Sequence, residues 1–76
     1  MRTFQEVIEA LGGVSGLRAA LSISYEAARK MRDRDNIPAV YWPRLIDAAA
    51  RLGLEDITPE SLVEIVRRRA EEGEAA

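Results

Sequence analysis

The chain has 76 residues and a formal net charge of −2, which leaves room for one small domain. It contains neither cysteine nor histidine, and this excludes disulfides, thiolate zinc sites and imidazole bases. A hydrophobic fraction of 47% with 32% charged residues is typical of a folded globular domain and is too interrupted by charge for a membrane span. We therefore expect a cytoplasmic protein that is not an enzyme and needs neither metal nor cofactor.

The charges are unevenly distributed along the chain. Residues 18–51 hold seven basic side chains against four acidic ones, whereas residues 52–76 hold three against seven. A basic middle segment is compatible with a partner that carries phosphates, although the pI of 5.1 is low for a nucleic-acid-binding domain.

The beginning of the chain has the pattern of a capped amphipathic helix. Thr3, with Glu6 three positions later, forms a capping box, and apolar residues recur at helical spacing up to Leu11. We expect a helix over residues 3–11 that ends at Gly12–Gly13, because glycine adopts the left-handed conformation without a Cβ penalty.

Two further short helices should follow, joined by a tight connection. Ser15 is the expected N-cap of a helix of about seven residues, and Ser24 is the expected N-cap of a helix over residues 25–32. Such a pair forms a helix-turn-helix, here at about residues 15–33. Its brace should consist of apolar side chains from both helices, namely Leu17, Leu21, Ile23, Ala28 and Met31.

The second half of the chain predicts two more helices. Residues 33–36 form a polar turn before Pro38, and a fourth helix should end at Gly53, with Tyr41 and Trp42 packed at its start. Thr58–Pro59 opens a last helix at about residues 59–70. The sequence has no strand pattern, so we predict an all-α bundle of about five short helices, a single domain over residues 1–70 followed by a frayed acidic tail over residues 71–76.

At these residues the sequence resembles the small Cro/C1-like helix-turn-helix proteins of phages and bacteria. The resemblance covers GGVSGLRAALSIS at residues 12–24, the segment from Arg32 to Arg34 and IPAVYWP at residues 37–43, about half of the chain. Arg18, Ser22 and Met31 depart from it, since the family has a small alanine, a glycine and a tryptophan there. The resemblance implies a homodimeric transcriptional regulator, phage- or prophage-derived, that binds double-stranded DNA and is associated with the nucleoid.

The resemblance also implies which residues contact DNA. In the family, the helix after the turn enters the major groove, and arginine is the side chain best suited to guanine and to phosphate. The expected base-reading residues are Tyr25, Glu26, Arg29 and Lys30, and the expected phosphate contacts are Ser15, Ser24, Arg32, Arg34 and Arg44.

The same residues have a simpler interpretation as a solvated helix face. Glu26 is four positions before Lys30 and is expected to form an ion pair with it. Asp33 and Asp35 are expected to neutralise the remaining basic side chains of this segment. The alternative function is then a protein-interaction module that keeps the helix-turn-helix frame, acting as an adaptor, an antitoxin-like inhibitor or a modulator of another DNA-bound protein. DNA binding is favoured if the four basic side chains of residues 29–34 share one face of the helix and Asp33 and Asp35 do not shield their charges.

The last helix has more apolar side chains than one short helix needs for its own packing. Leu62, Val63, Ile65 and Val66 are expected to serve a dimer interface, since helix-turn-helix proteins commonly pair to address two half-sites. The alternative is that all four pack on the chain's own helices. A protein partner such as RNA polymerase or a nucleoid protein is compatible with either function.

Overall fold

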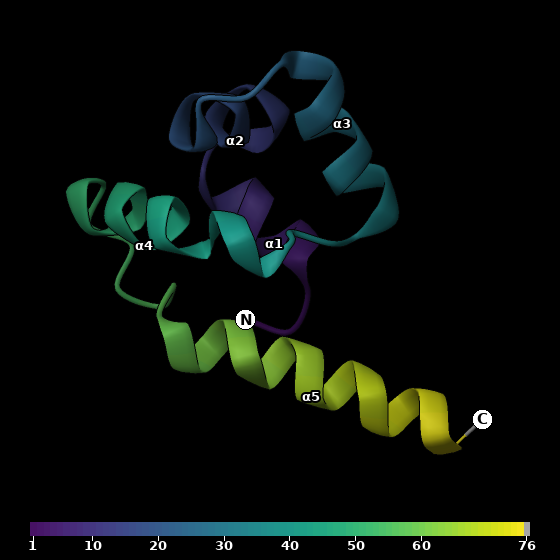
Figure 1. The fold of residues 1–76 in the computed structure, drawn as a ribbon. Helices are drawn as coiled ribbons and strands as arrows, with labels where there is room; N and C mark the ends of the chain where they lie inside the picture. The colour runs from purple at the N-terminus through teal and green to yellow at the C-terminus, as the bar shows by residue number, and fades with distance from the viewer. Residues whose placement is uncertain (76) are drawn as a thin grey trace.

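Helices make up the fold of the described chain. The computed structural model describes the backbone of residues 1–75 and the side chains of residues 1–73. Within this part there are five α-helices, one turn of 3-10 helix and no strand, which confirms the predicted all-α class. The elements are α1 (Phe4–Ala10), α2 (Gly13–Leu21), α3 (Tyr25–Arg34), η1 (Ala39–Tyr41), α4 (Trp42–Arg51) and α5 (Pro59–Ala75). Figure 1 shows α5 as a separate layer that runs beneath α4 and extends past the other helices.

The turn between α1 and α2 is made by two glycines. Gly12 and Gly13 have φ angles of 103° and 81°, in the left-handed region that side chains disfavour. The chain reverses so sharply there that α2 begins at Gly13. Ser15 was predicted as the N-cap of this helix, and that prediction is wrong: Gly12 is the N-cap, and Ser15 lies exposed in the first turn. The helix is consequently nine residues long instead of seven.

The other predicted caps are present. The Thr3 hydroxyl accepts a hydrogen bond from the Glu6 N–H at 3.1 Å. At the start of α5, Thr58 and Ser61 cap each other, because each hydroxyl accepts from the other residue's backbone N–H, at 3.1 and 2.9 Å. These bonds satisfy amides that have no partner inside the helix.

One core joins all five helices. Trp42 lies at its edge, where the indole N–H donates to the carbonyl oxygen of Ile37 at 2.8 Å and the ring packs 6.3 Å from that of Phe4. The predicted packing role of Trp42 is therefore confirmed. The buried side chains are Phe4, Val7, Ile8, Leu11, Val14, Leu17, Leu21, Ala28, Ile37, Leu45, Ala49, Ile57, Leu62 and Ile65.

The last helix differs from the prediction in length. It continues to Ala75, so residues 71–75 are helical and the predicted frayed tail is wrong for them, while Ala76 lies outside the described residues. Glutamates that follow residue 70 are good helix formers. Arg67 also bridges the predicted end, because it pairs with Glu64 at 2.5 Å on one side and with Glu71 on the other.

Candidate nucleic-acid interface

A turn of three residues, Ser22 to Ser24, joins α2 to α3. Ser22 adopts a left-handed conformation, with φ 55° and ψ 47°, and its N–H donates to the carbonyl of Arg18. Two residues later, the Ser24 hydroxyl accepts from the N–H of Ala27 at 3.1 Å and starts α3. The left-handed conformation of Ser22 is one that glycine would adopt without a Cβ penalty.

The predicted brace between α2 and α3 is confirmed. Leu17, Leu21 and Ala28 are completely buried, so the two helices share a tightly packed seam. Ile23 from the turn and Met31 from α3 are partly buried against the same core. This packing fixes α3 at the upper edge of the molecule in Figure 1, with its other side free for contact.

The free side of α3 carries the predicted base-reading residues. Tyr25 is 53% exposed, and Glu26 and Lys30 are exposed as well. The side chain of Arg29 is 41% exposed. Because residues three and four apart lie on the same face of a helix, these four side chains form one surface.

Acidic side chains hold two of the arginines on this surface. The Arg29 guanidinium lies 2.6 Å from the Glu26 carboxylate and 3.1 Å from that of Asp33, and Arg32 lies 3.0 Å from Asp33. The hydrogen bond with Arg29 lowers the pKa of Glu26 and raises that of Arg29. The predicted pair of Glu26 with Lys30 is wrong, because the Arg29 guanidinium takes the carboxylate. Within residues 1–73, neither Lys30 nor Arg34 takes part in an ion pair.

Asp35, in contrast, does not shield the basic side chains of α3. Its carboxylate lies 3.0 Å from Arg69 of α5 and accepts a hydrogen bond from the backbone N–H of Gln5 at 2.9 Å. The charges of Lys30 and Arg34 are therefore unshielded, which is the arrangement that favours DNA binding, whereas acidic side chains shield those of Arg29 and Arg32. Sequence reasoning placed Asp33 in a turn, whereas it lies in the last turn of α3, beside both arginines.

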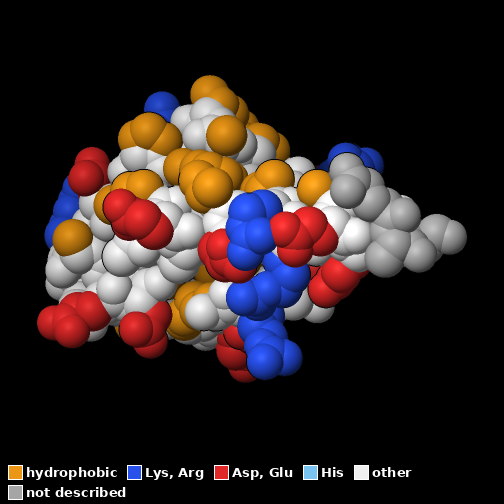
Figure 2. All heavy atoms as spheres, turned by 90° about the horizontal axis from the view of Figure 1, so that it is seen from below, with side chains coloured by type: hydrophobic (Ala, Val, Ile, Leu, Met, Phe, Trp, Pro, Cys, Tyr) orange, Lys and Arg blue, Asp and Glu red, His pale blue; other side chains and the backbone are white. Residues whose placement is uncertain are grey.

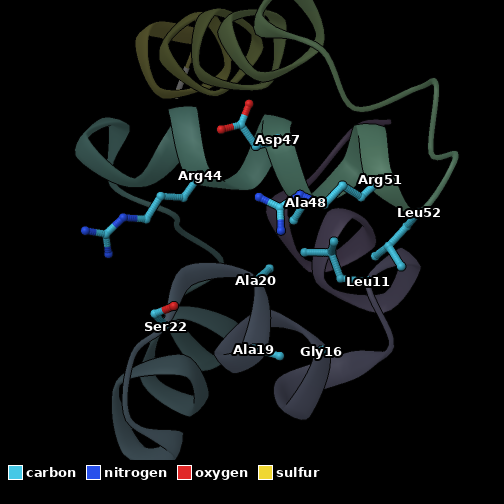
Figure 3. A pocket seen from close by; sticks show the side chains of 10 residues that line it. All are labelled: Leu11, Gly16, Ala19, Ala20, Ser22, Arg44, Asp47, Ala48, Arg51 and Leu52. Atoms are coloured by element: carbon cyan, nitrogen blue, oxygen red, sulfur yellow. The ribbon is translucent and has the colours of Figure 1, made fainter.

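Arg32, one of the five predicted phosphate-binding residues, pairs with Asp33, and the other four fall into two groups. Ser15 and Arg34 are exposed. Ser24 and Arg44 already have protein partners: the Ser24 hydroxyl caps α3, and the Arg44 guanidinium donates to the carbonyl oxygen of Leu21 at 3.0 Å. Arg44 therefore satisfies a carbonyl at the end of α2, where a cation is favoured by the helix dipole. Figure 3 shows this side chain extending from α4 toward the turn at Ser22.

A hollow of about 570 Å³ lies between α2 and α4 (Figure 3). Small residues of α2 and α4 form its floor, including Gly16, Ala19 and Ala48, while Arg51 and Leu52 line its rim. Leu52 is 61% exposed there. No sequence pattern predicts this hollow, because it depends on the crossing of two helices that are distant in the chain.

Comparison with protein-family models, curated proteins and solved structures finds no match to the chain. In the part of the chain that the structure describes, no group of three or more acidic side chains is placed to hold a metal ion. None of its described helices is long and apolar enough to cross a membrane.

Proposed function

We propose that the protein is a sequence-specific DNA-binding transcriptional regulator of the Cro/C1-like type that inserts α3 into the major groove. The observation that carries this proposal is the geometry around Ser22. A tight turn with a left-handed residue joins two helices across a buried seam, and the second helix presents polar side chains outward. A helix held in this way can enter a groove about 12 Å wide without unfolding its surroundings.

Base reading belongs to Arg29, with Tyr25, Glu26 and Lys30 beside it on the same face. Arginine donates two parallel hydrogen bonds to guanine, and a glutamate accepts from the amino group of cytosine. The ion pair of Arg29 with Glu26 does not oppose this role strongly, since pairs between exposed side chains are weak and exchange readily. Phosphate contacts belong to Arg34, which takes part in no ion pair within residues 1–73, and to Ser15, whose hydroxyl is exposed in the first turn of α2.

Two substitutions test this assignment by their different effects. Arg29→Ala should weaken binding at the preferred site about tenfold to a hundredfold and relax the base preference at one position. Arg34→Ala should weaken all duplexes alike and lower the slope of log affinity against log salt by about one. Affinities measured by fluorescence anisotropy on a selected site and on an unrelated duplex distinguish the two effects. Equal loss on both duplexes for Arg29→Ala would remove it from base reading.

A second candidate function follows from the shielding of the arginines. Glu26 and Asp33 form ion pairs with Arg29 and Arg32, two of the four basic side chains that α3 could present to a phosphate backbone. A surface of alternating charges suits a protein partner better than DNA, and the apolar hollow beside Leu52 supplies a second contact. In this case the chain is an adaptor or antitoxin-like module. Absence of DNA binding at low salt, together with retention of a protein partner that Leu52→Glu abolishes, would support it.

A further inference from the structure

An apolar hollow opens between the second half of α4 and the start of α5. It has a volume of about 420 Å³ and is lined mainly by apolar residues, including Ile46, Ala50, Leu54 and Pro59. Ala50 and Pro59 are exposed, while Ile46 and Leu54 are partly buried. Residues 1–73 therefore leave this hollow open to solvent.

The exposed face of α5 continues the hollow along the helix. Val63 follows Pro59 by four positions and Val66 follows Val63 by three, so the three side chains lie in one line. Val63 is 54% exposed and Val66 is 46% exposed. Figure 2 shows a band of apolar side chains beside the charged side chains of α5. The α4–α5 surface, as we call this region, consists of Ile46, Ala50, Leu54, Pro59, Val63 and Val66.

The core uses a different face of α5. Leu62 and Ile65 are completely or almost completely buried. They were predicted to contribute to a dimer interface, and their burial in the chain's own core shows that this prediction is wrong for both. Val63 and Val66, the other two predicted residues, remain on the surface and are accessible to a partner.

Acidic side chains surround the α4–α5 surface. Residues 52–66 hold four acidic side chains and no basic one. Glu55 lines the hollow, Asp56 follows it in the loop, and Glu60 lies in the first turn of α5. These three side chains are exposed, and none of them takes part in an ion pair within residues 1–73. Their negative charge is therefore available to a partner.

The arginines closest in sequence do not neutralise this charge. Arg67 is held by two carboxylates of its own helix, Glu64 and Glu71. Arg51 lines the other hollow, between α2 and α4. The α4–α5 surface is consequently apolar in its centre and negative at its edge.

We propose that the α4–α5 surface binds an amphipathic helix of a protein partner. The apolar face of that helix covers the hollow and the two valines, and its lysine or arginine side chains lie opposite Glu55, Asp56 and Glu60. Exposed apolar patches with a polar rim are typical of interaction sites, and a helix laid in a groove is a recurring way to cover them. The basic flanks follow from charge complementarity with the three carboxylates.

The same charges disfavour other occupants. The phosphates of DNA and the headgroups of an anionic membrane are repelled by carboxylates that lack a counter-charge. A second copy of the chain that pairs through this surface brings the same three carboxylates to a two-fold interface, where like charges face each other. A basic helix is the occupant that meets both the apolar centre and the negative edge.

The α4–α5 surface is separate from the candidate nucleic-acid interface. In Figure 1, α3 lies at the upper edge of the molecule and α5 lies beneath α4. The partner helix can therefore bind whether or not α3 contacts DNA. The proposal goes beyond the proposed function, and its test uses no DNA, so failure of one leaves the other standing.

The test is a titration of the full chain with a synthetic peptide of leucine and lysine, about 14 residues long, whose leucines recur at steps of three and four. A second peptide has glutamate in place of each lysine. Fluorescence anisotropy of labelled peptides gives the affinities, and the lysine peptide should bind at least about tenfold more tightly. In NMR spectra of the labelled protein, it should shift the amide signals of Ala50, Val63 and Val66.

Substitutions on the surface separate its apolar and acidic contributions. Val66→Ser should weaken binding of the lysine peptide about tenfold, because it removes an apolar contact from the centre. Glu60→Gln should weaken it about threefold. Glu9→Gln, at an exposed glutamate of α1, makes the same change of charge elsewhere and should have no effect. Circular dichroism verifies that each variant remains helical.

Three results overturn the proposal. The first is equal affinity of the lysine and glutamate peptides, because the carboxylates then select nothing. The second is a set of shifted amides confined to α3, where Glu26 and Asp33 would be the acidic partners. The third is a dimer of the unaltered chain that Val66→Ser dissociates, because a second copy then covers the valines.

Discussion

Arg69 and Asp35 join α5 to the end of α3 across 34 positions of sequence. The Arg69 guanidinium donates to the backbone oxygen of Asp35 at 2.6 Å and lies 3.0 Å from its carboxylate, while the same group stacks 5.4 Å above the ring of Phe4. Asp35 is itself in the left-handed conformation that ends α3, with φ 51°. The orientation of α3 relative to α5 is therefore fixed at this point.

Removal of this link should loosen the fold. We expect Arg69→Ala to lower the free energy of unfolding by about 1 kcal/mol, because a charged hydrogen bond and a cation–π contact at a partly exposed site are lost. Urea denaturation followed by circular dichroism measures the change. Arg51→Ala, an exposed arginine at the end of α4, is the matched control and should have little effect. Equal effects of the two substitutions would contradict a structural role for Arg69.

The turn at Ser22 should tolerate glycine better than serine. We expect Ser22→Gly to raise the free energy of unfolding by about 0.5–1 kcal/mol, since the left-handed conformation carries a Cβ penalty that glycine avoids. Ser15→Gly is the matched control, because it places the same residue in a helical turn and should destabilise by about 0.5 kcal/mol. A loss of stability in both variants would argue against the left-handed conformation of Ser22.

Gly16 should be required for the contact between α1 and α2. A Cβ atom at this position lies 1.8 Å from the carbonyl oxygen of Leu11, so the backbone has to move to admit it. We expect Gly16→Ala to lower the free energy of unfolding by about 2–4 kcal/mol. Gly73→Ala, at an open position of α5, should instead raise it by about 0.5 kcal/mol. Thermal unfolding compares the pair, and a stable Gly16→Ala variant would contradict the close approach.

The shielding of the arginines predicts a gain of function. Asp33→Asn releases Arg32 and removes one of the two carboxylates that hold Arg29, so we expect affinity for duplex DNA to rise about threefold and the salt dependence to steepen. Asp47→Asn removes the same charge from α4 and is the matched control for the change in net charge. An identical response of both variants in an anisotropy titration would show that Asp33 has no specific effect on the arginines.

The extent to which these features can be predicted depends on whether their causes are local. The caps at Thr3, Ser24 and Thr58 each depend on residues within three positions, and the sequence predicts all of them. Ser15 has an equally suitable side chain, but the left-handed turn at Gly12–Gly13 starts α2 earlier. Choosing between two possible starts requires the backbone path, which the sequence pattern does not supply.

Most of the wrong predictions about the candidate site concern features that depend on tertiary packing. Leu62, Val63, Ile65 and Val66 cover more than one face of a helix, and only the packing of α5 on the other helices decides which pair is buried. The bond from Arg44 to the carbonyl of Leu21 spans 23 positions and likewise has no local signature. The sequence predicts that Asp33 neutralises basic side chains of this segment, and only its placement in a turn is wrong, since α3 continues to Arg34, two residues beyond its predicted end.

The pair of Glu26 with Arg29 predicts a measurable titration. The pKa of Glu26 should lie below the ordinary value for a glutamate and should return toward it in Arg29→Ala, because the hydrogen bond from Arg29 favours the carboxylate. The stability that the pair contributes is present above the ordinary pKa and is lost as the pH falls through the lowered pKa. Carboxyl chemical shifts followed by NMR measure both values, and an unchanged pKa in the variant would contradict the pairing.

The most direct test of the account is binding of the purified chain to a pool of random duplex DNA at low and at moderate salt, followed by selection and sequencing of the retained duplexes. We expect binding that weakens with salt, because phosphate contacts release counterions, and enrichment of one short sequence that Arg29→Ala no longer selects. If the folded chain does not bind DNA at low salt, or if its binding does not depend on salt, α3 is not a DNA-reading helix.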